Sequence, residues 1–193
     1  MKGTIILLLG AFIGLGMSLI FKKRGIYLVL ITVLSAFLFY KFRFVSNSIF
    51  FLRVALAIFL FIYSLCTDTS KLKINPLIIK ILMFVLLLIN IKIYTLSKVL
   101  ALIMSAALFY LIFFFLKRVG KSFKKVEMLG DTDLLLIAFT GLYLNFLPGL
   151  KALLIATLLA LPLSIYIMKK KNNSRISFTP FIVLGLLLVD YYG

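Results

Sequence analysis

Two of the chain's five acidic residues stand where a pair of carboxyl groups could do chemistry. Asp68 follows an apolar run at residues 48–66, and Asp131 precedes another at 132–147. Charged side chains close to lipid are costly and usually functional. Two carboxyl groups a few ångströms apart share one proton, so the ionised group can draw a proton from water while its partner protonates a carbonyl oxygen. If Asp68 and Asp131 meet, they could act as an aspartyl protease, which needs no metal ion and no other cofactor.

Helix capping is the alternative role for both aspartates. Asp68 could cap the helix that follows it or lie in solvated headgroups among Lys71 and Lys73. Asp131 or Thr132 could be the N-cap of the helix expected at 132–147. Asp133 would then be a favourable acid in the first turn of that helix. These residues alone leave both interpretations open.

The composition places these residues in a membrane protein. The 193 residues are 64% hydrophobic, whereas soluble domains have about 45–50% apolar residues. A helix needs about 20 mostly apolar residues to cross a bilayer. We therefore expect an all-α, polytopic transmembrane helix bundle in a single integral membrane domain, residues 1–193, with residues 117–130 as a loop. Charge clusters and turn residues predict about eight spans, at 4–21, 25–41, 48–66, 76–95, 98–116, 132–147, 150–168 and 178–192.

The formal net charge of +17 follows the same organisation. The connections after the first, third, fifth and seventh segments hold roughly twice as many basic residues as the opposite side, which predicts that these connections face the cytoplasm. Nucleic-acid binding is not expected, because no basic, aromatic-bearing soluble domain is present. The chain has no His and only Cys66, which argues against histidine-based catalysis, a metal site and an internal disulfide.

The segment around the second aspartate reads EMLGDTDLL, from Glu127 to Leu135. It resembles the GxGD signature of the type IV prepilin peptidases, commonly written GxGDxKL. Gly130, Asp131 and the following Leu match, whereas Met128 replaces the first Gly and Asp133 replaces the Lys. We expect Gly130 to allow a close backbone approach beside Asp131.

Two further segments carry the resemblance. Asp68 is followed six residues later by Ile74 and then by Asn75 and Pro76, where the family has Pro-Asn. Residues 176–185, ISFTPFIVLG, resemble the family's closing helix, IPFGPFLALG. The two aspartates and this helix occur in the family's order, and the resemblance covers most of the chain. The short form also resembles the archaeal preflagellin peptidases.

The resemblance implies an aspartic-type endopeptidase of the inner (cytoplasmic) membrane. It would remove the short basic leader from a prepilin or pseudopilin at the cytoplasmic face, while the apolar helix of the substrate lies in the bilayer. Asp68 and Asp131 would be catalytic. Many relatives carry a four-Cys cytoplasmic domain and methylate the new N-terminus. Here that position holds only residues 22–25, so the metal domain is missing and methyl transfer is in doubt. Four residues would support the site: Gly130, Asp133, Glu127 and Pro76.

Three other interpretations are open. Glu127 could tune Asp131, recognise a basic leader, or pair with Lys124 or Lys125 in a solvated loop. The chain could be a small transporter that uses membrane carboxylates, but this predicts acids near the bilayer midplane and paired broken helices. It could also be an inactive homologue that binds pilins without cutting them, which the departures at Met128 and Asp133 motivate.

Overall fold

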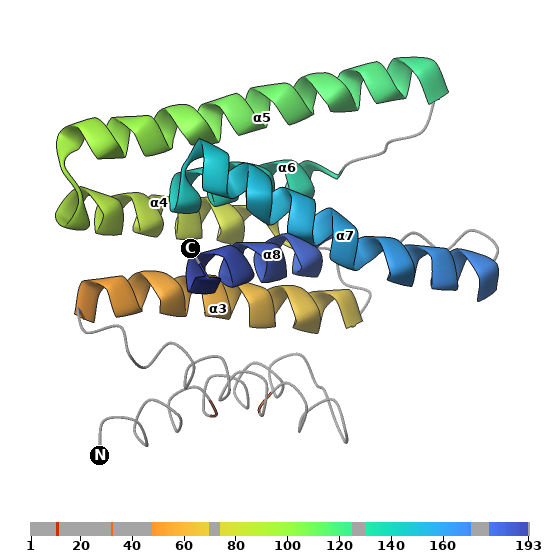
Figure 1. Cartoon of the computed structure of the whole chain (residues 1–193), viewed down its shortest axis with the longest axis horizontal. Helices are drawn as coiled ribbons and strands as arrows, with labels where there is room; N and C mark the ends of the chain where they lie inside the picture. The colour runs from red at the N-terminus through yellow and green to blue at the C-terminus, as the bar shows by residue number, and fades with distance from the viewer. Residues whose placement is uncertain are drawn as a thin grey trace. The chain divides into compact units, whose positions relative to one another are not determined.

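A computed structural model describes residues 48–69, 74–124, 130–170 and 178–192, together with Ala11 and Thr32 (Figure 1). The chain divides into two compact units, Met1–Ile74 and Asn75–Gly193. All regular structure in the described residues is helical, which confirms the all-α class. The predicted spans at 4–21 and 25–41 lie outside these residues, apart from Ala11 and Thr32, which are helical.

The described part of the first unit is helix α3 (Ser48–Thr69). Most of its buried side chains are apolar, and Ala57, Ile58 and Ile62 have no exposed surface, but Arg53, Ser64 and Thr67 are buried as well. The helix continues three residues beyond its predicted end at 66. Asp68 therefore lies in the last turn of α3 and not in the connection after it.

The second unit contains five helices. They are α4 (Pro76–Ile93), α5 (Leu96–Lys124), α6 (Asp131–Leu144), α7 (Phe146–Lys170) and α8 (Thr179–Tyr192). The prediction of a loop at 117–130 is wrong for residues 117–124, because α5 continues to Lys124. The segment from Val99 to Lys124 has no Pro and is rich in Leu and Ala, which are strong helix formers.

Local capping explains where these helices begin and end. Asn75 is the N-cap of α4, where its side-chain oxygen accepts a 3.0 Å hydrogen bond from the Leu77 N–H, and Pro76 occupies the first helical position. Asp68 is therefore not the cap of α4, and this alternative is wrong. Between α6 and α7, Asn145 adopts a φ of 77°, and its side chain accepts a 2.7 Å bond from the Phe146 N–H. One residue thus ends α6 and starts α7. The predicted connection between these helices, at 147–150, lies several residues too far toward the C-terminus.

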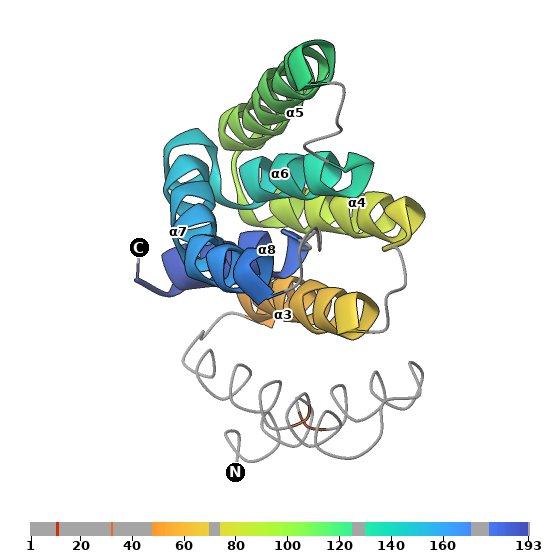
Figure 2. The same cartoon turned by 90° about the vertical axis from the view of Figure 1, so that its right-hand side faces the viewer.

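Helix α6 lies at the centre of this unit. It contacts α4, α5, α7 and α8, as the view along the helices shows (Figure 2). Every residue from Leu136 to Tyr143 is buried. A helix that is apolar on all sides belongs in a core, and this sequence has no polar face between its first turn and Tyr143.

The outer helices expose large apolar side chains. Phe84 on α4, Phe115 on α5 and Leu158 on α7 are all more than half exposed. Three helical segments are long and apolar enough to cross a membrane: Pro76–Ile93, Leu96–Gly120 and Phe146–Tyr166. By contrast, α6 and α8 have 14 residues each, which is about 21 Å of helix against a hydrocarbon layer of about 30 Å. The chain is thus a membrane protein, and in its second unit the longer helices α4, α5 and α7 and the short α8 pack around the short central helix α6.

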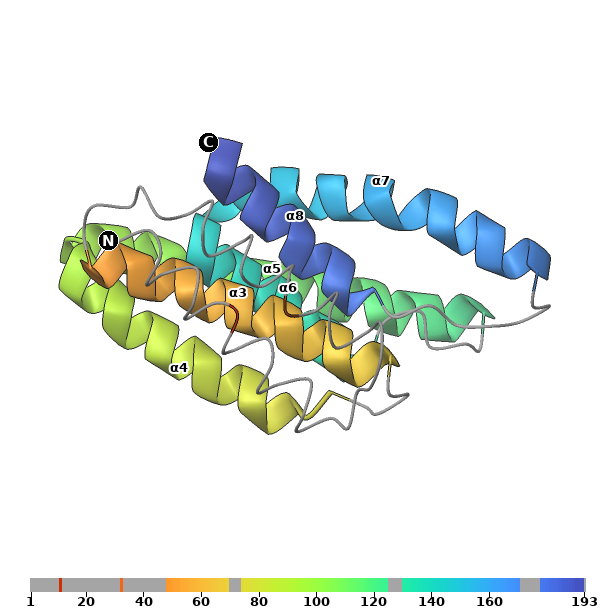
Figure 3. The same ribbon diagram turned by 90° about the horizontal axis from the view of Figure 1, so that it is seen from below.

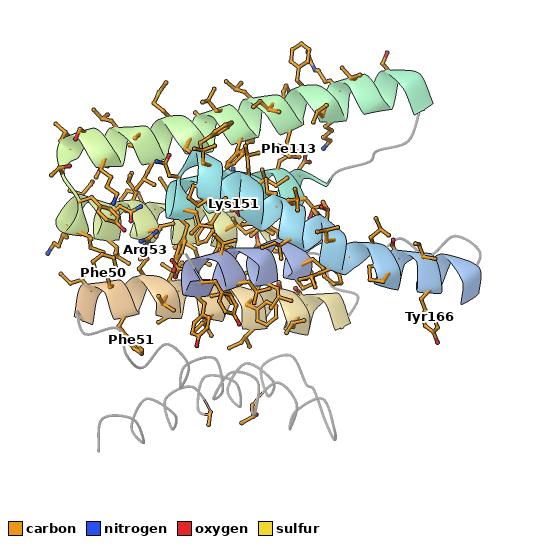
Figure 4. All side chains as sticks on the ribbon, in the orientation of Figure 1. Phe50, Phe51, Arg53, Phe113, Lys151 and Tyr166 are labelled. Carbon is orange, nitrogen blue, oxygen red and sulfur yellow. The ribbon has the colours of Figure 1, made fainter. Side chains whose placement is uncertain are left out.

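Helices α7 and α8 pack closely at one point. A Cβ on Gly185 would collide with the backbone carbonyl oxygen of Ala152 and would lie 3.1 Å from the Ala156 nitrogen. Small residues spaced four apart allow helix backbones to approach in membrane proteins. Beyond this crossing α7 continues past the N-terminal end of α8 (Figure 3), and the exposed Tyr166 projects from that extension (Figure 4).

Candidate functional site

Asp131 is the first residue of α6, and its side chain is 87% exposed. The N-cap is Gly130, with φ −73° and ψ 157°, so the prediction that Asp131 or Thr132 is the cap is wrong. These backbone angles are open to any residue. Among the described residues, the nearest atom to an added Cβ would be Asp133 Oδ2, at 3.3 Å, and none of their backbone atoms makes the close approach that the sequence predicted at Gly130. The carboxylate of Asp131 thus stands free of the helix and can reach a partner.

Lys117 of α5 makes an ion pair with Asp131. The lysine Nζ lies 2.5 Å from Asp131 Oδ1, and only 14% of the lysine side chain is exposed. The hydrogen bond and the positive charge of Lys117 together hold the pKa of the Asp131 carboxyl below its usual value. Asp131 is therefore ionised at neutral pH.

Asp133 makes different contacts, although it lies only two residues away in the same turn. Its Oδ2 accepts a 3.2 Å bond from the Gly130 N–H, which is one half of a capping box. Its Oδ1 accepts a 2.9 Å bond from the hydroxyl of Thr179, the first residue of α8. Asp133 lies outside the three candidate spans. Its burial raises the pKa of its carboxyl, and the bonds from Thr179 and Gly130 partly offset this rise. The sequence-based interpretation of Asp133 as a first-turn acid is confirmed, and the structure adds the link to α8.

A second polar contact joins α6 and α8 at their other ends. The Tyr143 hydroxyl donates a 2.8 Å bond to Asp190 Oδ2. Thr179 starts α8 and Asp190 lies near its end, just as Asp133 and Tyr143 stand at the two ends of α6. The two helices therefore run parallel.

Helix α4 runs in the same direction. Near its C-terminal end, Asn90 donates a 3.0 Å bond to the Leu142 carbonyl near the C-terminal end of α6. The N-terminal ends of α4, α6 and α8 thus lie together, and the Lys117–Asp131 pair brings the C-terminal part of α5 to the same end.

The remaining predicted site residues are placed as follows. Pro76 is the first residue of α4. The backbone of Asp68 belongs to α3, but its side chain lies outside the described residues, as do Glu127 and Met128. The two units are described separately, so the meeting of Asp68 with Asp131 stays a prediction.

Sequence reasoning missed two residues of this region, Lys117 and Thr179. Lys117 was assigned to a loop among other lysines, and Thr179 was noted only as part of the closing segment. No local signal pointed to either residue, because Lys117 is one of several lysines in its segment and Thr179 has no charged neighbour in the sequence. In the part of the chain that the structure describes, no group of three or more metal-ligating acids or thiols is found.

Comparison of this chain with protein-family models, with curated proteins and with solved structures finds no match.

Proposed function

We propose that this chain is an aspartic-type endopeptidase of the inner membrane, with about eight spans, that removes the leader of a prepilin-like protein at the cytoplasmic face. Asp68 and Asp131 are its catalytic pair. The substrate carries a short basic leader followed by an apolar helix. This helix enters the bilayer beside the peptidase, so that the leader junction reaches the two carboxyl groups.

The contact between Asp133 and Thr179 carries the proposal. These residues belong to the two segments of the second unit on which the resemblance to the prepilin peptidases rests, and 46 positions separate them in the chain. Their hydrogen bond brings the start of the closing helix to the turn that holds Asp131. A resemblance made of short, separated motifs gains support when the motifs lie together at one place in the fold.

The position of Asp131 also suits the chemistry. Its carboxylate is exposed at the end of a buried helix, where water and a peptide can reach it. Acids at the ends of helices favour a peptidase that works at the membrane boundary over a transporter, which needs its acids near the midplane.

The reaction requires one ionised and one protonated carboxyl group. The carboxylate takes a proton from water, and the resulting hydroxide attacks the carbonyl carbon of the scissile bond while the other carboxyl protonates the carbonyl oxygen. The tetrahedral diol then collapses, and one of its hydroxyl groups returns a proton to the carboxyl that had donated one. The C–N bond breaks, and the leaving nitrogen takes up the proton that the base had accepted.

The experiment that tests the proposal is cleavage of a prepilin-like substrate by the purified full-length protein in lipid. We expect Asp68→Asn and Asp131→Asn each to lower the rate by on the order of a thousandfold or more, because neither half of a proton-sharing pair works alone. Asp190→Asn is the matched control. Asp190 lies at the opposite end of α8 from Thr179, and an asparagine there can still accept the Tyr143 hydrogen bond, so cleavage should be retained.

Two results would count against the proposal. If Asp131→Asn cleaved at the wild-type rate, Asp131 would not be catalytic. If the folded wild type cut none of a panel of leaders but still bound the substrates, the chain would be a pilin-binding protein without peptidase activity.

A further inference from the structure

Lys117 is held more firmly than a loop lysine would be. Helix α5 continues to Lys124, about two turns beyond Lys117, so the backbone at Lys117 is helical on both sides. The lysine side chain is 14% exposed and that of Asp131 is 87% exposed. The stem of Lys117 is covered by the bundle and its rotamer freedom is already reduced. The bundle therefore fixes the position of the Lys117 ammonium, whereas the Asp131 carboxylate that it contacts faces solvent.

Among the described charged residues, Lys117 is the main partner of Asp131. Asp133, the neighbouring acid, is occupied by Thr179 and by the Gly130 N–H. Arg118, next to Lys117 on α5, lies over the Phe114 ring at 5.4 Å from its centroid. On α4, the charged residue nearest to the end that holds Asp131 is Lys80, which is exposed. Lys151 of α7 and Asp190 of α8, the charged side chains described on these helices, lie toward the opposite end of the unit. The first turn of α6 adds its own positive partial charge, which also favours an ionised Asp131.

We propose that Lys117 is a positioning residue that keeps Asp131 as the ionised member of the catalytic pair, so that Asp131 accepts the proton of the attacking water and Asp68 protonates the substrate's carbonyl oxygen. This assignment of roles rests on the proposed peptidase function. Two chemically identical carboxyl groups are equally good bases unless the surroundings of one differ from those of the other. The ion pair from α5 supplies that difference.

The first test measures Asp131 itself and needs no activity. The chain contains four aspartates, Asp68, Asp131, Asp133 and Asp190. Protein labelled with ¹³C at the aspartate carboxyl therefore gives four signals, which single Asp→Asn variants assign. We expect the Asp131 signal to titrate at higher pH in Lys117→Met than in wild type. Lys117→Arg, which keeps the charge, should titrate close to wild type, and so should Arg118→Met, which removes the adjacent charge.

The second test measures the pH profile of cleavage with the same variants. A base must be ionised, so kcat/KM falls as the pH drops through the pKa of Asp131. In Lys117→Met the acid limb of the profile should move to higher pH, which lowers kcat/KM several-fold at the acid end and by less than about twofold at the optimum. Lys117→Arg should restore the wild-type limb. This rescue separates the loss of charge from a general loss of structure, and circular dichroism checks that each variant is folded.

The outcomes separate this inference from the peptidase proposal. An Asp131 signal that titrates alike in wild type and Lys117→Met overturns the role of Lys117, whatever the enzyme does. If the signal shifts but the alkaline limb moves in place of the acid limb, Asp131 is the proton donor and the assignment of roles is wrong. If the folded wild type cleaves nothing, the peptidase function fails and the catalytic roles fail with it, while the titration still decides whether Lys117 keeps Asp131 ionised.

Discussion

Asp131 and Asp133 show how two identical side chains in one helical turn acquire different tasks. Asp131 points into solvent toward Lys117, whereas Asp133 is half-buried and bonded to Gly130 and Thr179. The pKa of Asp131 is lowered and that of Asp133 is raised. The cause is the surroundings, because a nearby cation favours the charged form and removal from water disfavours it. Asp133 is thus a structural acid, and Asp131 is the one available for chemistry.

The Asp133–Thr179 bond can be tested with an isosteric substitution. Thr179→Val removes the hydroxyl and leaves Asp133 without its donor on α8, which should cost about 1–3 kcal/mol because a covered polar group loses its partner. Thr179→Ser keeps the hydroxyl and should lose less. Heat unfolding in detergent, followed by far-ultraviolet circular dichroism, measures the difference.

Thr157→Val is the matched control for this substitution. The Thr157 hydroxyl donates only to the Leu154 carbonyl one turn earlier in α7, at an exposed position, so its loss should shift the unfolding temperature little. Equal unfolding temperatures for Thr179→Val and wild type would show that the bond contributes nothing to holding α8 on α6.

Helix α8 is held to its neighbours by polar bonds at both ends and by close packing between them. Asp133 and Tyr143 of α6 bond its first turn and its last turn. Between these bonds, Gly185 lies against α7 at Ala152 and Ala156. In lipid the hydrophobic effect does little to drive helices together, so association depends on such close contacts and hydrogen bonds.

A methyl group at Gly185 should therefore disturb the α7–α8 contact. Gly185→Ala would push a Cβ into the Ala152 carbonyl oxygen, which belongs to helix backbone and cannot move independently. We expect a loss of about 1–3 kcal/mol from overpacking, despite the better helix propensity of alanine. The unfolding temperature in detergent measures this.

Gly149→Ala provides the comparison within the same unit. Its Cβ would meet the ring of Phe109, at 2.6 Å from Cε2, and a side chain can shift where a backbone cannot. The loss should be smaller than for Gly185→Ala. A larger loss for Gly149→Ala would mean that the Phe109 contact, and not the α7–α8 crossing, is the tighter constraint.

The second unit as a whole alternates in direction from helix to helix. Helices α4, α6 and α8 start at the end that holds Asp131, whereas α5 and α7 finish there. The last residues of α5 and α7, Lys124 and Lys170, therefore belong to the end of the unit that carries Asp131. The expectation from the positive-inside rule that this end faces the cytoplasm stays a prediction.

Single cysteines at the two ends of α5 test this orientation. Ser97 and Ser122 are both exposed. They are 25 positions apart, which corresponds to about 38 Å of helix, more than the hydrocarbon layer of about 30 Å. In a Cys66→Ser background, we expect Ser122→Cys to react with a membrane-impermeant maleimide only from the cytoplasmic side. Ser97→Cys should react only from the other side. The opposite pattern would place Asp131 outside and rule out a cytoplasmic cleavage site.

The helices themselves could be predicted from the sequence with good accuracy. Continuous apolar runs, charge clusters and prolines mark α4 to α8 to within a few residues, except where α5 runs on to Lys124. The reason is physical: in lipid every backbone polar group must be satisfied within its own segment, so an apolar run of this length has to be a helix. The same patterns placed Asp131 and Asp133 at the start of α6.

The partners of these residues could not be predicted, because they depend on packing between distant segments. Lys117 and Asp131 are 14 residues apart, and Thr179 and Asp133 are 46 apart. Nothing in the local pattern distinguishes Lys117 from the lysines after it. Only the central place of α6, between α5 on one side and α8 on another, brings these side chains together. That packing also made one acid an ionised, exposed group and the other a bridge between helices, since the environment of each acid decides its state.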